Sequence, residues 1–221
     1  MAKIWVACCL LGMGLAGCYT IRGSTPVLFV FPAPNSSPVI PTAPPAPTPT
    51  PMMLSPGAIV GSPYFPPGNT SVGGQGAPVD GINCDNAAVG YHVHSHVSLF
   101  VSGTQLAIPL AIGLISPTYS DGGTVAGDGT CAYHLHTHDS SGIIHIENPA
   151  PTTFTLGQVF DIWGRPLSTS NVAGFAGPVL CYVGASLCSN DPRAIVLGDH
   201  EQITLEVGAP YVFPPFYTWP Y

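Results

Sequence analysis

Lysine is nearly missing from this chain of 221 residues, and positive charge of any kind is scarce. Lys3 is the only lysine, and the arginines are Arg22, Arg165 and Arg193. They stand against eleven Asp and Glu residues, so the net charge is −7 with neutral histidines. Such a surface does not neutralise phosphates, which argues against nucleic acid and anionic lipid surfaces as partners. It does not oppose the binding of cations.

Long apolar runs are missing beyond the first eighteen residues. The single long run, residues 4–15, follows Lys3 and is too short to span a bilayer, which is typical of an export signal. The segment 15–18, Leu-Ala-Gly-Cys, resembles the lipobox of bacterial lipoproteins, which implies a signal peptide over residues 1–17 and acylation of Cys18, such as palmitoylation. We therefore expect an exported protein that a lipid on Cys18 anchors to a membrane, in the periplasm or at the cell surface. An ordinary cleaved signal peptide would also export it.

Residues 18–80 are rich in Pro, Thr, Ser, Ala and Gly. Proline removes backbone donors and favours polyproline II, so this segment predicts an extended, disordered tether of about 3 Å per residue. The folded part is expected over residues 81–210, as one domain with one core. The aromatic and proline-rich tail, residues 211–221, either covers an edge of its own domain, which we favour, or reaches a partner.

Alternation of apolar and polar residues predicts a mainly β domain with one short α-helix. Thr155 can cap a helix over residues 156–163, and Gly164 followed by Pro166 ends it. The pattern does not separate a sandwich-like from a β-grasp-like arrangement. The predicted strands cover residues 90–101, 104–114, 131–138, 143–148, 178–184, 194–198 and 201–208.

Histidine is concentrated on three of these strands. Seven of the eight histidines fall there, and within each strand they occupy alternate positions, which places them on one face. The turn residues 139–142 predict a hairpin in which His136 lies opposite His145, and His134 opposite Glu147. The histidines on these strands are His92, His94 and His96, then His134, His136 and His138, then His145.

Imidazoles clustered at this spacing indicate a metal site. Imidazole suits copper and zinc, whereas calcium and magnesium prefer oxygen ligands. Nitrogen sites bind copper most tightly, so copper is the first expectation and zinc the second. Asp139 or Glu147 is expected to hold an outer ring nitrogen of a ligand, and the number of ions, one or two, stays open. The candidate ligands are His92, His94, His96, His136, His138 and His145, with His134 and Glu147 as secondary candidates.

Four cysteines follow Cys18, and no CxxC spacing is present. In an oxidising compartment disulfides are expected. Cys84 and Cys131 each precede a histidine strand, so we predict that they pair with each other, and that Cys181 and Cys188 form a local clip. Thiolate ligation of a soft metal is the alternative.

Three long blocks carry a resemblance. Residues 91–103, 136–147 and 154–164 resemble the HxHxH strand, the HTHDxSGxIHIE block and the TLGxFFxxWG helix of a family of exported, largely uncharacterised prokaryotic proteins. The resemblance implies membership and export, but no established activity. His134 falls where that family has other residues, which makes it a secondary candidate. The patterns of copper/zinc superoxide dismutases and of cupins do not fit the chain.

Three functions are open from the sequence. The first is a lipid-anchored module that captures, buffers or transfers copper or zinc. The second is an enzyme in which a three-histidine metal with an open position activates water or oxygen. The third is a surface interaction protein whose histidines form a pH-titrating face. His200 lies in a predicted turn and is interpreted as a surface residue.

Overall fold

The computed structural model of the protein describes residues 50–87, 89–188 and 191–219. The predicted signal peptide over residues 1–17, Cys18 and the tether up to residue 49 lie outside the described residues. None of the helices in the described part of the chain is long and apolar enough to cross a membrane.

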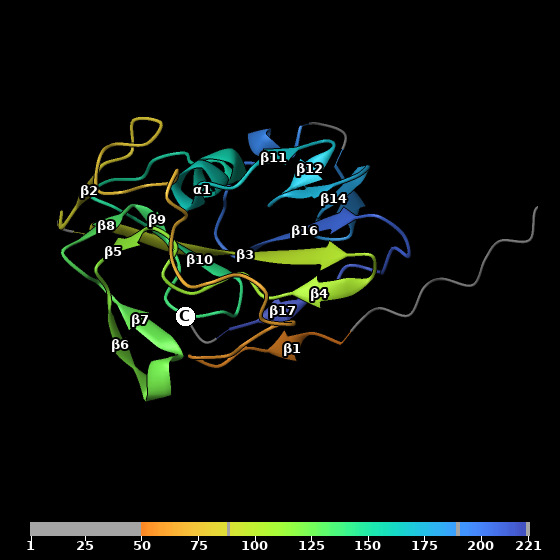
Figure 1. The fold of residues 1–221 in the computed structure, drawn as a ribbon, viewed down its shortest axis with the longest axis horizontal. Helices are drawn as coiled ribbons and strands as arrows, with labels where there is room; N and C mark the ends of the chain where they lie inside the picture. Colours follow the sequence, from red (N-terminus) through yellow and green to blue (C-terminus); the bar gives the residue numbers. More distant parts are fainter. Residues whose placement is uncertain (1–49, 88, 189–190, 220–221) are drawn as a thin grey trace, which may run out of the picture. The chain divides into compact units, whose positions relative to one another are not determined.

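A seven-stranded sheet lies at the centre of the domain (Figure 1). Its long middle strand β3, Tyr91–Val101, pairs antiparallel with β10, Ile143–Asn148, and parallel with β16, Glu201–Val207. The sheet continues through β9 on one side and through β14 and β15 on the other, and β4 pairs with the end of β3. These strands are Leu135–His136, Val179–Val183, Ser186–Leu187 and Thr104–Leu106. The predicted mainly β fold is confirmed.

The single α-helix, α1, spans Leu156–Trp163, as predicted. Thr155 and Gln158 form a capping box at its start, because each side chain binds the other residue's backbone N–H. Gly164 ends the helix with a φ of 75°, a conformation that glycine adopts without steric cost. The apolar side of α1 packs on the core face of the central sheet, where Val97 and Ile144 are also buried.

Short strands complete the domain in four smaller sheets. Two of them are three-stranded and two are pairs. The strands are β2 Cys84–Asp85, β8 Cys131–Tyr133 and β5 Leu114–Ile115; β11 Leu167–Ser168, β12 Asn171–Val172 and β13 Phe175–Ala176; β6 Thr118–Ser120 and β7 Val125–Gly127; β1 Met52–Met53 and β17 Tyr217–Thr218. Two 3-10 helices, η1 and η2, cover Asp121–Gly123 and Pro192–Ala194.

Two predicted strands are shorter than expected. The strand predicted over 104–114 is reduced to β4 and β5, because Pro109 has no N–H to donate and because Ala111 and Gly113 take positive φ values of 64° and 74°. The strand predicted over 131–138 is broken between β8 and β9 and ends at His136. Each break produces a loop that lies next to the histidines.

The strand predicted over 194–198 is absent from the described residues. Its start belongs to η2, where the side chain of Asp191 accepts a hydrogen bond from the backbone N–H of Arg193. Beyond η2, Val196 forms one isolated bridge with Thr155. Proline at the first turn of η2 favours the helical φ over an extended one.

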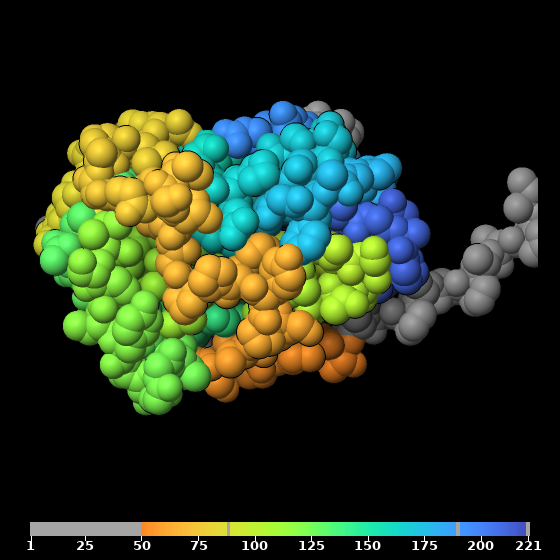
Figure 2. Space-filling view, viewed as in Figure 1, coloured from red at the N-terminus to blue at the C-terminus, as the bar shows by residue number. Residues whose placement is uncertain are grey.

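Residues 50–80 differ from the expectation of a disordered tether, because they fold onto the domain. Leu54 and Phe65 are buried, and the ring of Phe65 meets that of Trp163 edge-on with centroids 4.8 Å apart. The N–H of Gly74 donates to the carbonyl of Ile162 at 2.7 Å. Figure 2 shows the orange part of this segment lying across the surface. Apolar side chains between the prolines therefore reach buried positions that composition does not reveal.

The aromatic tail also folds back, as favoured from the sequence. Strand β17 pairs parallel with β1, and both Tyr217 and Trp219 are buried. Gln202 of β16 holds the tail by exchanging hydrogen bonds with the backbone of Tyr217 at 2.8 and 2.9 Å. The tail thus covers part of the sheet face opposite α1 (Figure 1).

Both predicted disulfides are present. Cys84 of β2 pairs with Cys131 of β8, and Cys181 of β14 pairs with Cys188. The Cα atoms are 5.4 Å apart in each pair, an ordinary distance for a disulfide. The first disulfide joins the segment before β3 to the segment that leads into β9.

Candidate metal centre

Five histidines on three strands share the face of the central sheet that lies opposite α1: His92, His94 and His96 of β3, His136 of β9 and His145 of β10. In the register of the sheet, His145 of β10 lies between His94 of β3 and His136 of β9, and Glu147 lies opposite His92. The predicted opposition of His136 and His145 is confirmed. Directly opposed residues on one sheet face have neighbouring side chains, so the three strands bring these groups together.

The first group of donors combines β3 and β10. The Nδ1 atom of His145 is 3.3 Å from Nε2 of His92 and 3.2 Å from Nε2 of His94. All three donor atoms lie within 4.8 Å of one another. Two nitrogens bound at about 2.0–2.1 Å to one ion at a tetrahedral angle are roughly 3.3 Å apart. The observed distances between the nitrogens therefore match those between two nitrogen ligands of one ion.

The second group joins β9 and the turn after it to β10, because His136 and His138 lie near His145 and Glu147. The Nε2 atoms of His136 and His138 are 3.1 Å apart. The opposite ring nitrogens donate to backbone carbonyls, Nδ1 of His136 to Tyr133 at 2.8 Å and Nδ1 of His138 to Ala126 at 2.6 Å. A carbonyl oxygen only accepts, so each Nδ1 carries the hydrogen and, in the neutral ring, each Nε2 carries a lone pair.

Two lone pairs facing each other at 3.1 Å repel unless a cation lies between them. Burial, and then the neighbouring His138, lower the pKa of His136 to about 3, so the His136 ring is neutral at neutral pH. A metal ion that accepts both lone pairs removes the repulsion. The residues present therefore fit a metal ion, and the carbonyls act as the outer partners that fix the ring tautomers.

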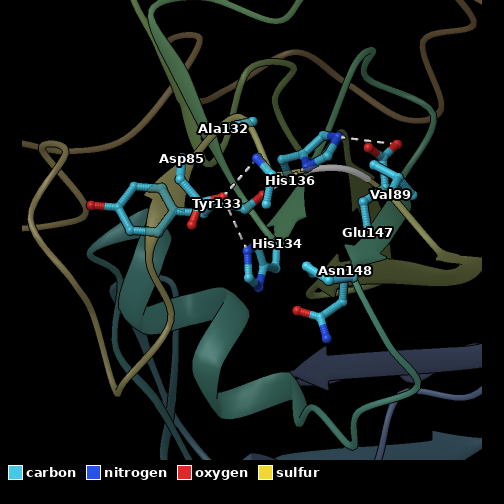
Figure 3. Close-up of a pocket in the computed structure, with 10 residues that line it drawn as sticks. Asp85, Val89, Ala132, Tyr133, His134, His136, Glu147 and Asn148 are labelled. Carbon is cyan, nitrogen blue, oxygen red and sulfur yellow. Dashed lines mark hydrogen bonds and ion pairs between the residues drawn. The ribbon is translucent and has the colours of Figure 1, made fainter.

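Glu147 lies among the inner nitrogens. Its Oε1 atom is 3.1 Å from Nε2 of His92, 3.7 Å from Nε2 of His136 and 3.8 Å from Nδ1 of His145. Figure 3 shows its carboxylate directed at the ring of His136. The secondary candidate Glu147 thus forms part of the centre and supplies its negative charge.

Asp139, expected to hold an outer ring nitrogen, has a different partner set. Its Oδ2 accepts the N–H of Gly57 at 2.8 Å, and its Oδ1 accepts the N–H of Ser141 at 2.9 Å. The carboxylate therefore closes the turn after His138 and fastens residues 50–80 to it. Carbonyl oxygens take the role that the sequence suggested for carboxylates.

Thr137 sets the position of the two histidines beside it. Its hydroxyl donates to the carbonyl of Pro109 at 2.8 Å and accepts the N–H of Ile112 at 3.0 Å. Its backbone carbonyl accepts the N–H of Ala111 at 2.9 Å. Thr137 is fully buried, so the loop that replaces the predicted strand braces the segment carrying His136 and His138.

His96 was expected as a ligand, but the structure does not bring it into either donor group. It is 1% exposed, and its Nε2 donates to the carbonyl of Ser141 at 2.8 Å. Its ring lies 4.3 Å from that of Tyr217. Burial lowers the pKa of His96 to about 4, so the ring is neutral at neutral pH. The aromatic tail covers it, which the strand pattern alone did not indicate.

Two further histidines lie outside both groups. His134 lies in the break between β8 and β9, and its Nε2 is 3.4 Å from Oδ1 of Asp85 (Figure 3). Nδ1 of His200 is 3.0 Å from Oδ1 of Asp199, and its ring stacks on Trp219 with centroids 5.0 Å apart. His200 is largely exposed, in agreement with the interpretation from the sequence.

The buried histidines of the centre are neutral. Burial, and then the neighbouring His92, lower the pKa of His94 to about 4. Burial, and then the nearby His136, also lower the pKa of His145. Since a neutral imidazole keeps a lone pair, these rings are in the form that binds a metal at neutral pH.

The centre borders two hollows of different size. One is an open pocket of about 590 Å³, and the other is a crevice of about 30 Å³. The crevice contains His134, His136 and Glu147 (Figure 3). The larger pocket is lined by Pro56, His92, His94, Val125, His138, Asp139, His145, Asp199 and His200. An ion and a small molecule therefore have access to the centre from solvent.

Comparison of the chain with protein-family models, curated proteins and solved structures finds no significant match. The family resemblance expected from the sequence therefore stays a prediction. Sequence reasoning missed the carbonyls of Tyr133 and Ala126 and the hydroxyl of Thr137. A carbonyl leaves no trace in the sequence, since every residue has one, and a single threonine carries no motif.

Proposed function

We propose that this protein binds copper or zinc ions at the histidine centre in order to capture and hold them. The observation that supports this most directly is the pair of Nε2 atoms of His136 and His138. They lie 3.1 Å apart, and both Nδ1 atoms are bonded to carbonyls. A buried arrangement of this kind is unfavourable on its own and favourable around a cation.

The donor set favours copper first and zinc second. Five imidazoles and one carboxylate come together, and none of the grouped donors in the described residues is a thiolate. Nitrogen ligands bind Cu²⁺ more tightly than the other divalent first-row metals, with Zn²⁺ weaker. The four cysteines of the described residues are joined in disulfides, so they are not available to a soft metal.

Capture and release both need access for the ion. His92, with 43% of its side chain exposed, lies at the solvent edge of the centre, whereas His136 lies 1% exposed at its base. An incoming ion can meet the exposed ring first and then the buried ones. We further propose that the chain is exported and that a lipid on Cys18 anchors the centre at a membrane.

Metal content and thermal melting of the full-length chain test the proposal. The chain is exported from an expression host without a histidine tag and divided into metal-loaded and chelator-treated samples. We expect stoichiometric copper or zinc in the loaded sample and a higher melting temperature than after chelation, because a ligand that binds only the folded state stabilises it. His145→Ala should remove both effects. Identical melting with and without metal would overturn the proposal.

The lipid anchor has its own test. Cys18→Ala should release the protein from the membrane fraction and abolish incorporation of labelled palmitate, while the metal content of the purified protein stays the same. A variant that remains in the membrane fraction would contradict the anchor and leave the metal centre untouched.

A second candidate function is metal-dependent hydrolysis, which the larger pocket favours. Asp199 and His200 form a carboxylate–imidazole pair in the same pocket as four candidate ligands. The backbone of His94 fixes the pair, since its carbonyl accepts the N–H of His200 at 2.7 Å. Hydrolysis of 4-nitrophenyl acetate by the zinc-loaded chain, lost in His200→Gln with the zinc retained, would support this function. Equal rates in both proteins would exclude His200 as a general base.

A further inference from the structure

The donors of the centre fall into two groups that share one residue. His92, His94 and His145 form one group, and His136, His138, His145 and Glu147 form the other, each with its donor atoms within 4.8 Å of one another. Six residues supply donors, whereas zinc sites in proteins usually take four ligands. The centre therefore holds more ligands than one such ion uses.

Each group has the spacing that one ion requires. In the first group the nitrogens of His92 and His94 are 3.3 and 3.2 Å from Nδ1 of His145. In the second group the nitrogens of His136 and His138 are 3.1 Å apart. Both values are close to the roughly 3.3 Å between two nitrogens on a tetrahedral ion. The two pairs of donors come from different elements, since β3 and β10 supply the first, and β9 and the turn after it supply the second.

Glu147 lies where it can serve both groups. Its Oε1 atom is 3.1 Å from Nε2 of His92, which belongs to the first group, and 3.7 Å from Nε2 of His136, which belongs to the second. A carboxylate can bridge two ions, and its charge reduces the repulsion between them. His145 is the one residue that belongs to both groups.

We propose that the centre binds two metal ions side by side. His92 and His94 hold one ion, His136 and His138 hold the other, and His145 and Glu147 lie between them. This inference rests on the proposed function and adds the number of ions to it. Members of both groups, including His94 and His138, line the pocket of about 590 Å³. A small anion in that pocket therefore reaches both ions. It offsets the positive charge of the two ions that the carboxylate of Glu147 does not compensate.

The number of ions per chain tests the proposal. The full-length protein is titrated with Zn²⁺ and with Cu²⁺, and the bound metal is counted after removal of the excess. We expect two ions in the unmodified chain. We expect one ion in His92→Gln, one in His138→Asn and none in His145→Ala. His134→Gln is the matched control, a histidine next to the centre but outside both groups, and it should keep two ions.

The outcomes separate the two proposals. One ion in the unmodified chain overturns the two-ion centre and leaves the proposed function standing, whereas no bound ion overturns both. If His92→Gln and His138→Asn each lost all metal while remaining folded by circular dichroism, the groups would act as one site and the two-ion centre would fail.

Electron paramagnetic resonance gives a second readout that does not depend on counting. Two Cu²⁺ ions that share ligands couple magnetically, so the fully loaded protein should give a weakened or broadened signal. His92→Gln, which changes a partly exposed side chain, should restore the spectrum of an isolated Cu²⁺ ion. An isolated-ion spectrum from the fully loaded unmodified chain would overturn the proposal.

Discussion

The two histidine triplets look alike in the sequence and differ in the structure. His92, His94 and His96 lie on the unbroken strand β3, and the alternation of the strand places them on one face. In the second triplet the chain breaks at His134, passes through β9 at His136 and enters a turn at His138. Each triplet nevertheless supplies two residues to the donor groups and leaves one outside.

The residue left outside is excluded for a different reason in each triplet. His96 has the correct face, but the tail brings Tyr217 onto its ring and the carbonyl of Ser141 takes its Nε2. His134 lies in the break between β8 and β9 and faces Asp85. The alternation of side chains along a strand therefore decides which histidines share a face. The segments that cover the sheet decide which of these histidines join the donor groups.

The triplets also differ in how firmly they are held. Both candidate ligands of the second triplet, His136 and His138, have a ring nitrogen bonded to a carbonyl, and Thr137 between them is buried with its hydroxyl bonded. In the first triplet, His92 is 43% exposed at the side chain. The second triplet is therefore the half of the centre with more bonds to the surrounding chain, and we propose that an ion enters through the first.

The largest effect should come from a comparison within the second triplet. His136→Gln removes a ligand at the base of the centre, so metal affinity should fall by more than the roughly 10–100-fold that loss of an outer partner causes. His134→Gln should leave affinity unchanged. Competition with a chromogenic chelator measures the metal dissociation constants of both variants. Equal losses in the two variants would mean that the strand break does not separate the histidines in solution.

A comparison within the first triplet should separate stability from binding. His96→Ala leaves a cavity beside Tyr217 and an unpaired carbonyl, so the free energy of unfolding should fall by about 2–4 kcal/mol while metal content stays the same. His92→Ala should change stability by less than about 0.5 kcal/mol because its side chain is partly exposed, yet lower the metal content. Urea unfolding of the metal-free proteins measures the free energy of unfolding. Metal loss in His96→Ala would instead assign that ring to the centre.

The bracing of the second triplet can be weakened without touching a ligand. Thr137→Val leaves the carbonyl of Pro109 and the N–H of Ile112 without their partner, which costs about 1–3 kcal/mol of stability. Metal affinity should fall about tenfold, as for other outer-shell changes. Thr137→Ser, which keeps the hydroxyl, should retain most of the stability and most of the metal affinity. Unchanged affinity in the valine variant would show that the loop does not position His136 and His138.

The last effect is gradual and depends on pH. Burial lowers the pKa of His96 to about 4 and that of His136 to about 3, below the ordinary value of 6.5. The unfolded chain therefore binds more protons between pH 6.5 and about 4. Stability of the metal-free chain is fully present above pH 6.5 and falls by up to about 1.4 kcal/mol per histidine for each pH unit below it.

Urea unfolding at pH 7 and pH 5 checks this dependence. The chelator-treated chain should unfold at a lower urea concentration at pH 5. His96→Phe, which places a non-titrating ring against Tyr217, should show a smaller difference between the two pH values. A chain with the same midpoint at both values would mean that these rings are solvated.

Local patterns in the sequence were sufficient for several elements. Residues 156–163 form the predicted helix because its cap, apolar stripe and terminal glycine lie within ten residues of one another. The hairpin register of His136 and His145 followed from the turn residues between them. The segment 50–80 could not be predicted, because its buried side chains contact residues far away, such as Trp163.

The sequence by itself determined the mainly β fold, the helix, both disulfides and the histidine-bearing face of the sheet. Each of these depends on neighbours in the chain or on a small number of possible pairings. The tertiary structure alone decided that Tyr217 covers His96, that the carbonyls of Tyr133 and Ala126 fix two rings, and that Glu147 joins the donors. The physical reason is that alternation along a strand is local, whereas the atoms that surround a side chain come from segments distant in the sequence.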